Sequence, residues 1–269
     1  MNHQGGELFL RKVRVALTPR SALLRTRLEN GAVVEGYNRA GYGGRGVYLF
    51  KDSLEPELRC LQNFLQPGHV FVDVGANVGV FTVKAAKEVG DKGLVIAIEP
   101  FLETALRLSG NVQANGFGNV RVRNFCIGRD TGHARLHLNQ GKPNSFSLVA
   151  RGNGKAESIS VLSVSLDDLC RWENLKRLDY LKIDAEGAEA AILEGAQETI
   201  RRFRPIVQVE VTICESSLSL NYRRFSAPNS VNHVFIPEEN AEAAETAKKL
   251  GWAEISRVPA PASLLLATS

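Results

Sequence analysis

Two acidic residues, Asp73 and Glu99, each stand at the end of an apolar run with the length of a buried strand. Asp73 lies in the run 70–74, directly before the turn Gly75–Gly79, and Glu99 follows the run 94–98. Glycines in such a turn permit positive φ values and a close approach of the backbone to a ligand. Apolar residues at helical spacing begin after the turn. A strand, a glycine turn and a helix start in this order open a nucleotide-binding βαβ unit.

The spacing of the turn and the two acids indicate which ligand it suits. The turn has the pattern G-x-x-x-G, whereas a dinucleotide site has G-x-G-x-x-G with free amides facing a pyrophosphate. A carboxylate at Asp73 would repel phosphate and attract the ammonium of an amino-acid-bearing ligand. Glu99 is placed to accept both hydroxyls of a ribose. We therefore expect S-adenosylmethionine rather than NAD; a turn that only caps the next helix is the alternative without a ligand.

A second group of ionisable residues follows the apolar run 180–183, in the sequence KIDAEG. The period of two along a strand places Lys182 and Asp184 on one face, and ligands of open α/β sheets bind outside the carboxyl ends of the strands. Asp184 is our first candidate for a general base, with Glu186 as a second and Lys182 orienting the acid or the substrate. The alternatives are structural, since Asp184 could cap the next helix and Glu186 could favour its positive end.

Further residues leave open whether the site holds a metal ion and whether another residue is the general base. Glu210, near the end of the run 206–211, is another acid on the same rim. Asp184, Glu186 or Glu210 could hold Mg²⁺, which would acidify a bound hydroxyl. Nothing in the sequence requires the metal, so Mg²⁺ is not expected and no metal-binding residue is assigned. His233 is a less secure candidate base.

The alternation of apolar runs and helical patterns indicates the elements that position these residues. Short β runs between Gly128 and about Arg171 predict an antiparallel insertion after the third strand, and 216–232 is expected to be a loop. The pattern predicts an α/β, doubly wound, mostly parallel seven-stranded sheet. Its strands are expected at 70–74, 94–98, 120–127, 180–184, 206–211, 233–237 and 258–268.

Residues 1–54 are expected to be an N-terminal extension, and residues 55–269 the main domain. In the extension, Ala32–Val34 and Val47–Phe50 have strand character and flank a glycine-rich stretch, so we expect a hairpin or flap at the substrate mouth. Residues 1–50 contain eight Arg or Lys and three Glu, which gives 8 − 3 = +5. Such a basic arm suits an anionic substrate, a membrane surface or nucleic acid, and a plain solvated surface explains it equally well.

Composition limits the class of protein. The chain has 269 residues, 44% apolar and 23% charged, with a net charge of +4, which indicates a globular α/β protein. It contains no apolar run of membrane-spanning length and no signal-peptide pattern at the N-terminus. The four cysteines are scattered without a C-x-x-C motif, so we expect buried thiols and a cytoplasmic location. Aromatic and basic residues do not interleave, and no nucleic-acid partner is expected.

Four blocks in order, FVDVGANVG, AIEP, LKIDAEGAEAAILEGA and RPIVQVEV, resemble the FkbM-type S-adenosylmethionine-dependent methyltransferases over about residues 55–211. The resemblance implies the class I methyltransferase fold and O-methylation of a hydroxyl on a sugar, polyketide or other secondary metabolite. The cofactor residues that we assign are Asp73, Gly75, Ala76, Asn77, Gly79, Glu99, Pro100, Phe125 and Cys126. The catalytic residues that we assign are Asp184, Lys182 and Glu186.

The identity of the small-molecule acceptor, the atom methylated and the oligomeric state stay open at this point. Two other classes of protein also stay open. The βαβ unit alone is compatible with a nicotinamide-dependent oxidoreductase, although Asp73 and the missing glycine pattern disfavour it. A cofactor-binding protein without turnover is the non-enzyme alternative.

Overall fold

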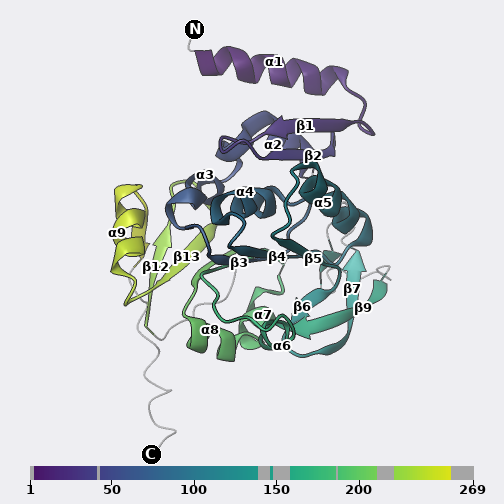
Figure 1. Ribbon diagram of the computed structural model, residues 1–269. Helices are drawn as coiled ribbons and strands as arrows, with labels where there is room; N and C mark the ends of the chain where they lie inside the picture. The colour runs from purple at the N-terminus through teal and green to yellow at the C-terminus, as the bar shows by residue number, and fades with distance from the viewer. Residues whose placement is uncertain are drawn as a thin grey trace, which may run out of the picture.

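The computed structural model describes residues 3–40, 43–138, 146–147, 158–185, 187–210 and 221–255. Its centre is an eight-stranded sheet with helices on both faces (Figure 1). The strand order is β14-β12-β13-β11-β10-β3-β4-β5. The five parallel strands are β3 (Val70–Val74), β4 (Leu94–Ile98), β5 (Val120–Arg123), β10 (Tyr180–Ile183) and β11 (Ile206–Glu210).

The connection of these strands identifies the ligand-binding edge. From β3 the chain proceeds outward to β4 and β5, and it then returns to the other side of β3 with β10 and β11. The strand order therefore reverses between β3 and β10, and ligands of doubly wound sheets bind at the carboxyl ends of the strands at such a point. The expected class I methyltransferase fold is confirmed.

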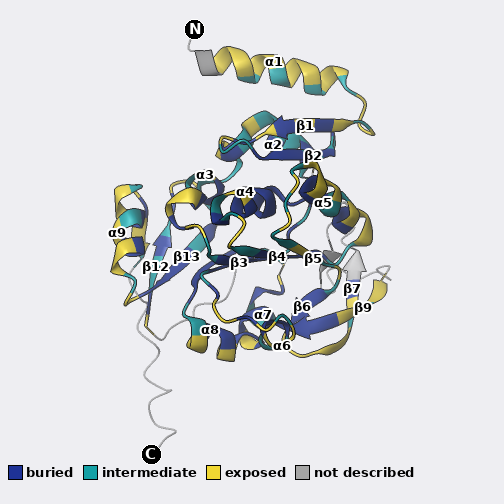
Figure 2. Ribbon diagram, in the orientation of Figure 1, coloured by how far each residue is buried: buried dark blue, intermediate teal, exposed yellow. Residues whose placement is uncertain are grey.

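Helices cover the two faces of the sheet (Figure 1). None of the described helices has the length and apolar content needed to cross a membrane. One face carries α3 (Pro56–Cys60), α4 (Val80–Val89) and α5 (Leu102–Ala114), and the other carries α6 (Leu166–Trp172), α7 (Glu189–Glu194) and α8 (Gln197–Phe203). Between α3 and β3 run the short 3₁₀ helix η2 (Leu61–Asn63) and a turn, and α9 (Ala241–Lys249) lies beside β12 and β13. The central strands are buried throughout (Figure 2).

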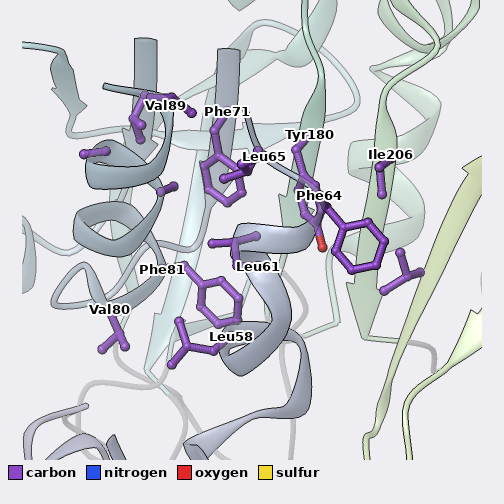
Figure 3. Close-up of a cluster of buried hydrophobic side chains, with 14 of the residues drawn as sticks. Leu58, Leu61, Phe64, Leu65, Phe71, Val80, Phe81, Val89, Tyr180 and Ile206 are labelled. Carbon is purple, nitrogen blue, oxygen red and sulfur yellow. The ribbon is translucent and has the colours of Figure 1, made fainter. Parts of the chain in front are cut away.

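Strand periodicity places the two large apolar clusters of the core on opposite faces of the sheet, and a third, small cluster lies around Ala97 and Leu108. Phe71 and Tyr180 stack with ring centroids 5.3 Å apart in the cluster beneath α3 and α4 (Figure 3). Val72, one residue further along β3, belongs to the cluster on the opposite face. Asp73 and Lys182 are each two residues beyond a member of the stacked pair, so they lie on the α4 side of the sheet and pair in register.

Of the eight strands in the described part of the sheet, two, at 222–226 and 253–255, were not among the seven that we expected. The stretch expected to be a loop contains β12 (Tyr222–Ser226), which pairs with both β13 (Asn232–Pro237) and β14 (Ala253–Ile255). Its buried aromatic residues, Tyr222 and Phe225, are three positions apart, so the strand lacks the alternation that would have predicted it. The strand expected at 258–268 lies outside the described residues.

The insertion after the third strand is confirmed as a separate four-stranded sheet, ordered β6-β9-β7-β8. Its strands are β6 (Cys126–Gly128), β7 (Gly132–Leu138), β8 (Phe146–Ser147) and β9 (Ser158–Ser165). β7 pairs antiparallel with both β8 and β9, while β6 pairs parallel with β9. The strand expected at 120–127 is therefore two strands, because the chain leaves the main sheet after β5 and enters this one.

The N-terminal extension does contain a hairpin, but the expected pair of strands is wrong. The helix α1 (His3–Leu17) is followed by β1 (Leu23–Arg27) and β2 (Val33–Tyr37), which pair around the turn at Asn30-Gly31. Gly31 has φ 89°, a conformation that glycine adopts without strain. The run 47–50, expected to be a strand, belongs to α2 (Gly44–Phe50), which leads into the 3₁₀ helix η1 (Lys51–Leu54). In α2 only Gly44 and Val47 are buried, three positions apart as in a helix.

Two asparagines of α5 fix the hairpin to the main domain. Asn111 Oδ1 accepts the Glu35 N–H at 2.8 Å, and its Nδ2 donates to the Glu35 carbonyl at 2.9 Å. Asn115 makes the same pair of bonds, both 2.7 Å long, with the backbone of Val33. Both main-chain groups of two β2 residues are thus satisfied by side chains of the main domain.

A buried ion pair makes a second connection between the extension and the main domain. Lys84 of α4 is 1% exposed and Asp52 of η1 is fully buried, with 2.5 Å between Nζ and Oδ1. The other carboxylate oxygen of Asp52 accepts the N–H of Glu29 in the hairpin loop at 2.8 Å. The neighbouring Asn30 donates to the Lys84 carbonyl at 3.2 Å. The pair therefore joins η1, the hairpin and α4 at one buried point.

Candidate active site

The glycine turn lies where the ends of three strands meet. Its Gly75 and Ala76 N–H groups both donate to the carbonyl of Ile98 at the end of β4, at 3.0 and 2.9 Å. Gly75 has φ 74°, and a Cβ there would lie 1.8 Å from the carbonyl oxygen of Asp184. Only glycine allows this approach between the ends of β3 and β10. Gly79, with φ 90°, ends the turn and begins α4.

Glu99 supports the turn from the end of β4. Oε2 accepts the Asn77 N–H at 2.9 Å, and Oε1 accepts the Phe101 N–H at 3.0 Å. Burial raises the pKa of Glu99 to about 7, although the two N–H groups oppose the shift. Each carboxylate oxygen has two lone pairs, so one on each remains for another donor. The predicted contact of Glu99 with the two hydroxyls of a ribose stays a prediction.

Asp73 is fully buried, and its two oxygens differ. Oδ2 accepts from the hydroxyl of Thr82 at 2.6 Å. Oδ1 lies 3.4 Å from Lys182 Nζ and makes no hydrogen bond within the described residues. In this conformation Asp73 offers no surface to a ligand, so its charge acts on the site through space and through Lys182. The predicted direct contact with a cofactor stays a prediction.

Lys182 and Asp184 occupy the face that strand periodicity predicted. Lys182 Nζ lies 3.5 Å from Asp184 Oδ2 and 5.0 Å from the ring centroid of Phe81. Burial opposes the charged form of Lys182, but the carboxylates of Asp184, Asp73 and Glu55 outweigh it and raise its pKa above the ordinary value. The side chain of Asp184 is 45% exposed, so this carboxylate faces the outside while the ammonium behind it is buried.

The structure shows that Asp184 does not cap the helix that follows it. The following helix α7 is capped at Ala188 without a side-chain hydrogen bond. Glu189 Oε1 instead accepts the N–H groups of Ala185 and Gly187, both at 3.1 Å. The acid that supports this loop is therefore Glu189, and Asp184 is left available for other contacts.

Two acids that sequence reasoning missed, Glu55 and Glu57, join the site from the start of α3. Asn232 Nδ2 at the start of β13 lies 3.2 Å from Glu55 Oε2 and 3.5 Å from Glu57 Oε2. Burial raises the pKa of Glu55 to about 7, with Lys182 opposing and Asp184 adding to the shift. Glu57 is 1% exposed, and its Oε1 has no hydrogen-bond partner in the described structure. A signal was present, since Glu57 falls four residues before the buried Leu61, at helical spacing from it.

Of the other predicted cofactor residues, Pro100 and Cys126 lie beside Glu99. Asn124 Nδ2 donates to the carbonyls of Glu99 and Pro100, both at 2.9 Å, which ties the end of β5 to the end of β4. Burial, aided by the charge of Glu99, raises the pKa of the adjacent Cys126 thiol to about 12. Phe125 packs against the apolar cluster on the opposite face of the sheet. Ala76 is buried within the turn.

The remaining candidates are Glu186, Glu210 and His233. Glu186 lies outside the described residues. Glu210, at the end of β11, is opposite Asn232 in the register. His233 accepts a hydrogen bond from Arg224 Nε at 2.7 Å, which engages it in the β12–β13 hairpin. Within the described ranges, no three His, Cys, Asp or Glu side chains are grouped so as to hold a metal ion.

The charges of this site do not balance. In the part of the chain that the structure describes, the interacting group consists of five carboxyl groups around one ammonium group, that of Lys182. The five acids are Glu55, Glu57, Asp73, Glu99 and Asp184. The raised pKa values of Glu55 and Glu99 reflect burial together with this excess of negative charge. Such a site attracts cations and repels phosphate.

Comparison with known proteins places the site in a family. Residues 73–237 match the methyltransferase FkbM domain. "Methyltransferase 1" of Beauveria bassiana is 25% identical over 54% of this chain and 64% of its own length. "2-O-methyltransferase NoeI" of Sinorhizobium fredii is 23% identical over 66% of this chain and 77% of its own length. The crystal structure of methyltransferase FkbM from Methylobacillus flagellatus superposes with a TM-score of 0.46 and 17% identity, covering 71% of this chain and 53% of that one. The chain thus spans only about half to two thirds of the fungal relative and of the solved FkbM structure.

Proposed function

Because the match covers more than half of its residues, the chain belongs to the FkbM family of S-adenosylmethionine-dependent methyltransferases, and we propose that it methylates a hydroxyl oxygen of a small-molecule acceptor. The relative NoeI is named a 2-O-methyltransferase, which supports oxygen as the target atom. Sugars, polyketides and other secondary metabolites are the acceptor classes that the family resemblance suggests.

The observation that carries the proposal is the excess of carboxyl groups around Lys182. S-adenosylmethionine has an ammonium, a sulfonium and one carboxylate, so its net charge is positive, whereas NAD has two phosphates. A site with unbalanced acids favours the first ligand and opposes the second. The free lone pairs of Glu99 suit the two ribose hydroxyls, and the glycine turn lets the backbone approach the ligand.

S-adenosylmethionine, when bound, supplies a methyl group on a sulfonium whose sulfur leaves as a neutral thioether. An alcohol has a pKa of about 16, like water, so its proton must leave as the oxygen attacks the methyl carbon. We assign Asp184 as the acceptor of that proton, because its carboxylate is exposed at the end of β10 and held by Lys182. Glu55 is the second candidate, since a pKa of about 7 suits a base at neutral pH.

The extension borders this site, which supports its predicted role at the substrate mouth. A Cβ on Gly43 would lie 2.6 Å from Val78 Cγ2, so the backbone before α2 rests directly on the glycine turn. Asn111 of α5 donates at once to the carbonyls of Val78 and Glu35, at 2.8 and 2.9 Å, which joins the turn to the hairpin. We place acceptor recognition between the extension and the exposed face of Asp184.

S-adenosylhomocysteine is expected to stabilise the protein and NADH is not. A ligand at a hundredfold excess over its dissociation constant adds about 2.7 kcal/mol to the free energy of unfolding. Differential scanning calorimetry with each ligand measures the shift in melting temperature. Glu99→Ala should lose most of the shift, whereas Glu103→Ala, an acid of the first turn of α5, should keep it. A shift with NADH and none with S-adenosylhomocysteine would end the methyltransferase proposal.

Cofactor affinity is expected to fall with decreasing pH. Glu99 must be ionised to accept two hydroxyl donors with both oxygens, and its pKa is about 7 in the free protein. Protonation below pH 7 competes with binding, so affinity at pH 6 should be about tenfold lower than at pH 8. Isothermal titration calorimetry between these values measures the slope, and Glu99→Gln should flatten it. An affinity that is constant over this range in the wild type would show that Glu99 does not contact the cofactor.

A further inference from the structure

The helix α1 stands apart from the two helix layers and contacts the protein through one side only (Figure 1). On that side Arg11 donates to the Leu49 carbonyl at 3.2 Å, and Asn38 donates to the Val15 carbonyl at 2.8 Å. Leu8, Arg11 and Val15 are half-buried there. The rest of the helix surface is exposed in the described structure (Figure 2).

The exposed side of α1 is apolar. Phe9 is 65% exposed, Val13 40% and Leu17 80%, and their spacing of four residues places them on one stripe along the helix. Leu10 adjoins the stripe and is 67% exposed. A helix that presents its large apolar side chains away from the protein has a partner outside it. We call these four residues the outer stripe.

Basic residues border the outer stripe on both sides. Successive helical residues are rotated by about 100°, so Lys12 and Arg14 project about 100° to either side of the stripe's centre. Glu7, whose side chain is 60% exposed, projects about 120° from the stripe's centre on the same side as Arg14, and its carboxylate is ion-paired with both Arg11 and Lys51. The outward face of the described helix therefore combines an apolar centre with Lys12 on one border and Arg14 on the other, and the charge of Glu7 beside Arg14 is matched by Arg11 and Lys51. The Arg14 guanidinium carbon also lies 5.9 Å from the ring centroid of Tyr48.

We propose that α1 binds the surface of an anionic lipid bilayer, with the outer stripe in the headgroup boundary and the basic borders among lipid phosphates. Apolar side chains with Lys and Arg alongside are the pattern of helices that lie in a membrane interface. A second copy of the chain is the rival occupant of the stripe. In a two-fold helix pair the same basic borders would face each other, and this repulsion favours the lipid surface. The proposal does not depend on the methyl-transfer reaction.

Vesicle flotation tests the proposal on the full chain. The wild type should bind vesicles containing phosphatidylglycerol, bind pure phosphatidylcholine weakly, and be released by salt. The double variant Phe9→Ser, Val13→Ser should bind about tenfold more weakly or worse, because a tenfold loss corresponds to only about 1.4 kcal/mol. Lys12→Ala should lose about fivefold on anionic vesicles alone. The melting temperatures should match, since these side chains are already exposed.

A matched control comes from α5. Leu102 and Leu106 are also four residues apart and are 59% and 64% exposed, so Leu102→Ser, Leu106→Ser removes a comparable apolar pair without touching α1. This control should bind anionic vesicles like the wild type. Equal binding by the α1 double variant, or equal loss in the α5 control, would overturn the proposal. The proposal would also be overturned if sedimentation showed a wild-type dimer that the α1 double variant abolishes and the wild type did not bind vesicles.

Discussion

Asp184→Asn is expected to lower kcat by about 100- to 10,000-fold and to leave the cofactor dissociation constant within about threefold. The exposed carboxylate of Asp184 is placed to take the acceptor's proton, whereas asparagine has the same size and cannot take it. The helix after Asp184 is not capped by its side chain, so the substitution removes no cap. Once an acceptor has been found, single-turnover kinetics with it measures the rate. Calorimetric titration measures the cofactor dissociation constant.

Glu55→Gln is the informative comparison for this prediction. If Asp184 is the base, Glu55→Gln keeps most of kcat and changes mainly the pH profile near pH 7, where Glu55 titrates. A near-wild-type rate for Asp184→Asn, with a large loss for Glu55→Gln, would contradict the assignment and move the base to Glu55. Equal melting temperatures for the two variants would show that neither effect comes from misfolding.

Lys84→Met is expected to destabilise the protein by about 3–5 kcal/mol, because it leaves the carboxylate of Asp52 buried without its ion-pair partner. Methionine fills a similar volume, so the loss of the charge rather than a cavity causes the effect. Asp52 also accepts the Glu29 N–H, so the hairpin should loosen together with η1. Chemical denaturation followed by circular dichroism measures the free energy of unfolding.

Two further variants test whether the loss of stability in Lys84→Met comes from the unpaired buried charge. Lys87→Met makes the same replacement at an exposed position of the same helix and should change stability by less than about 0.5 kcal/mol. The double variant Lys84→Met, Asp52→Asn removes both charges, retains an acceptor for Glu29 and should recover much of the loss. Equal destabilisation by Lys84→Met and Lys87→Met would mean that the ion pair contributes nothing specific.

The parts of the site that could be predicted are those that depend on residues close together in the sequence. The strand, turn and helix from β3 to α4 depend on consecutive residues, and periodicity alone placed Lys182 and Asp184 on one face. Parallel pairing of two predicted strands then brought Lys182 beside Asp73. Glu55 and Glu57 could not be placed in this way. They reach the site because α3 packs over the sheet, and acids beside a proline are also typical of an ordinary helix start.

The errors in the extension have a similar cause. The apolar run 47–50 has strand-forming residues, but a four-residue run does not distinguish a strand from a buried turn of helix. The turn at Asn30-Gly31 is a strong hairpin signal, yet the charged residues of β1 hide the alternation before it. Tertiary contacts determine the secondary structure of both segments. In the hairpin, the second strand is the one that meets the asparagines of α5.

The asparagines of α5 hold the hairpin in a way that does not depend on the side chains of β2. Four residues advance a helix by about 6 Å and two residues advance a strand by about 6.6 Å, so Asn111 and Asn115 match alternate residues of β2. They bind only main-chain groups, which every residue except proline provides. The partly exposed side chains of β2, Glu35 and Tyr37, can therefore change while the position of the hairpin above the glycine turn stays constant. If the hairpin contacts the acceptor, as we propose, a methyltransferase built in this way would acquire new acceptors by changing these side chains without rebuilding the attachment of the hairpin.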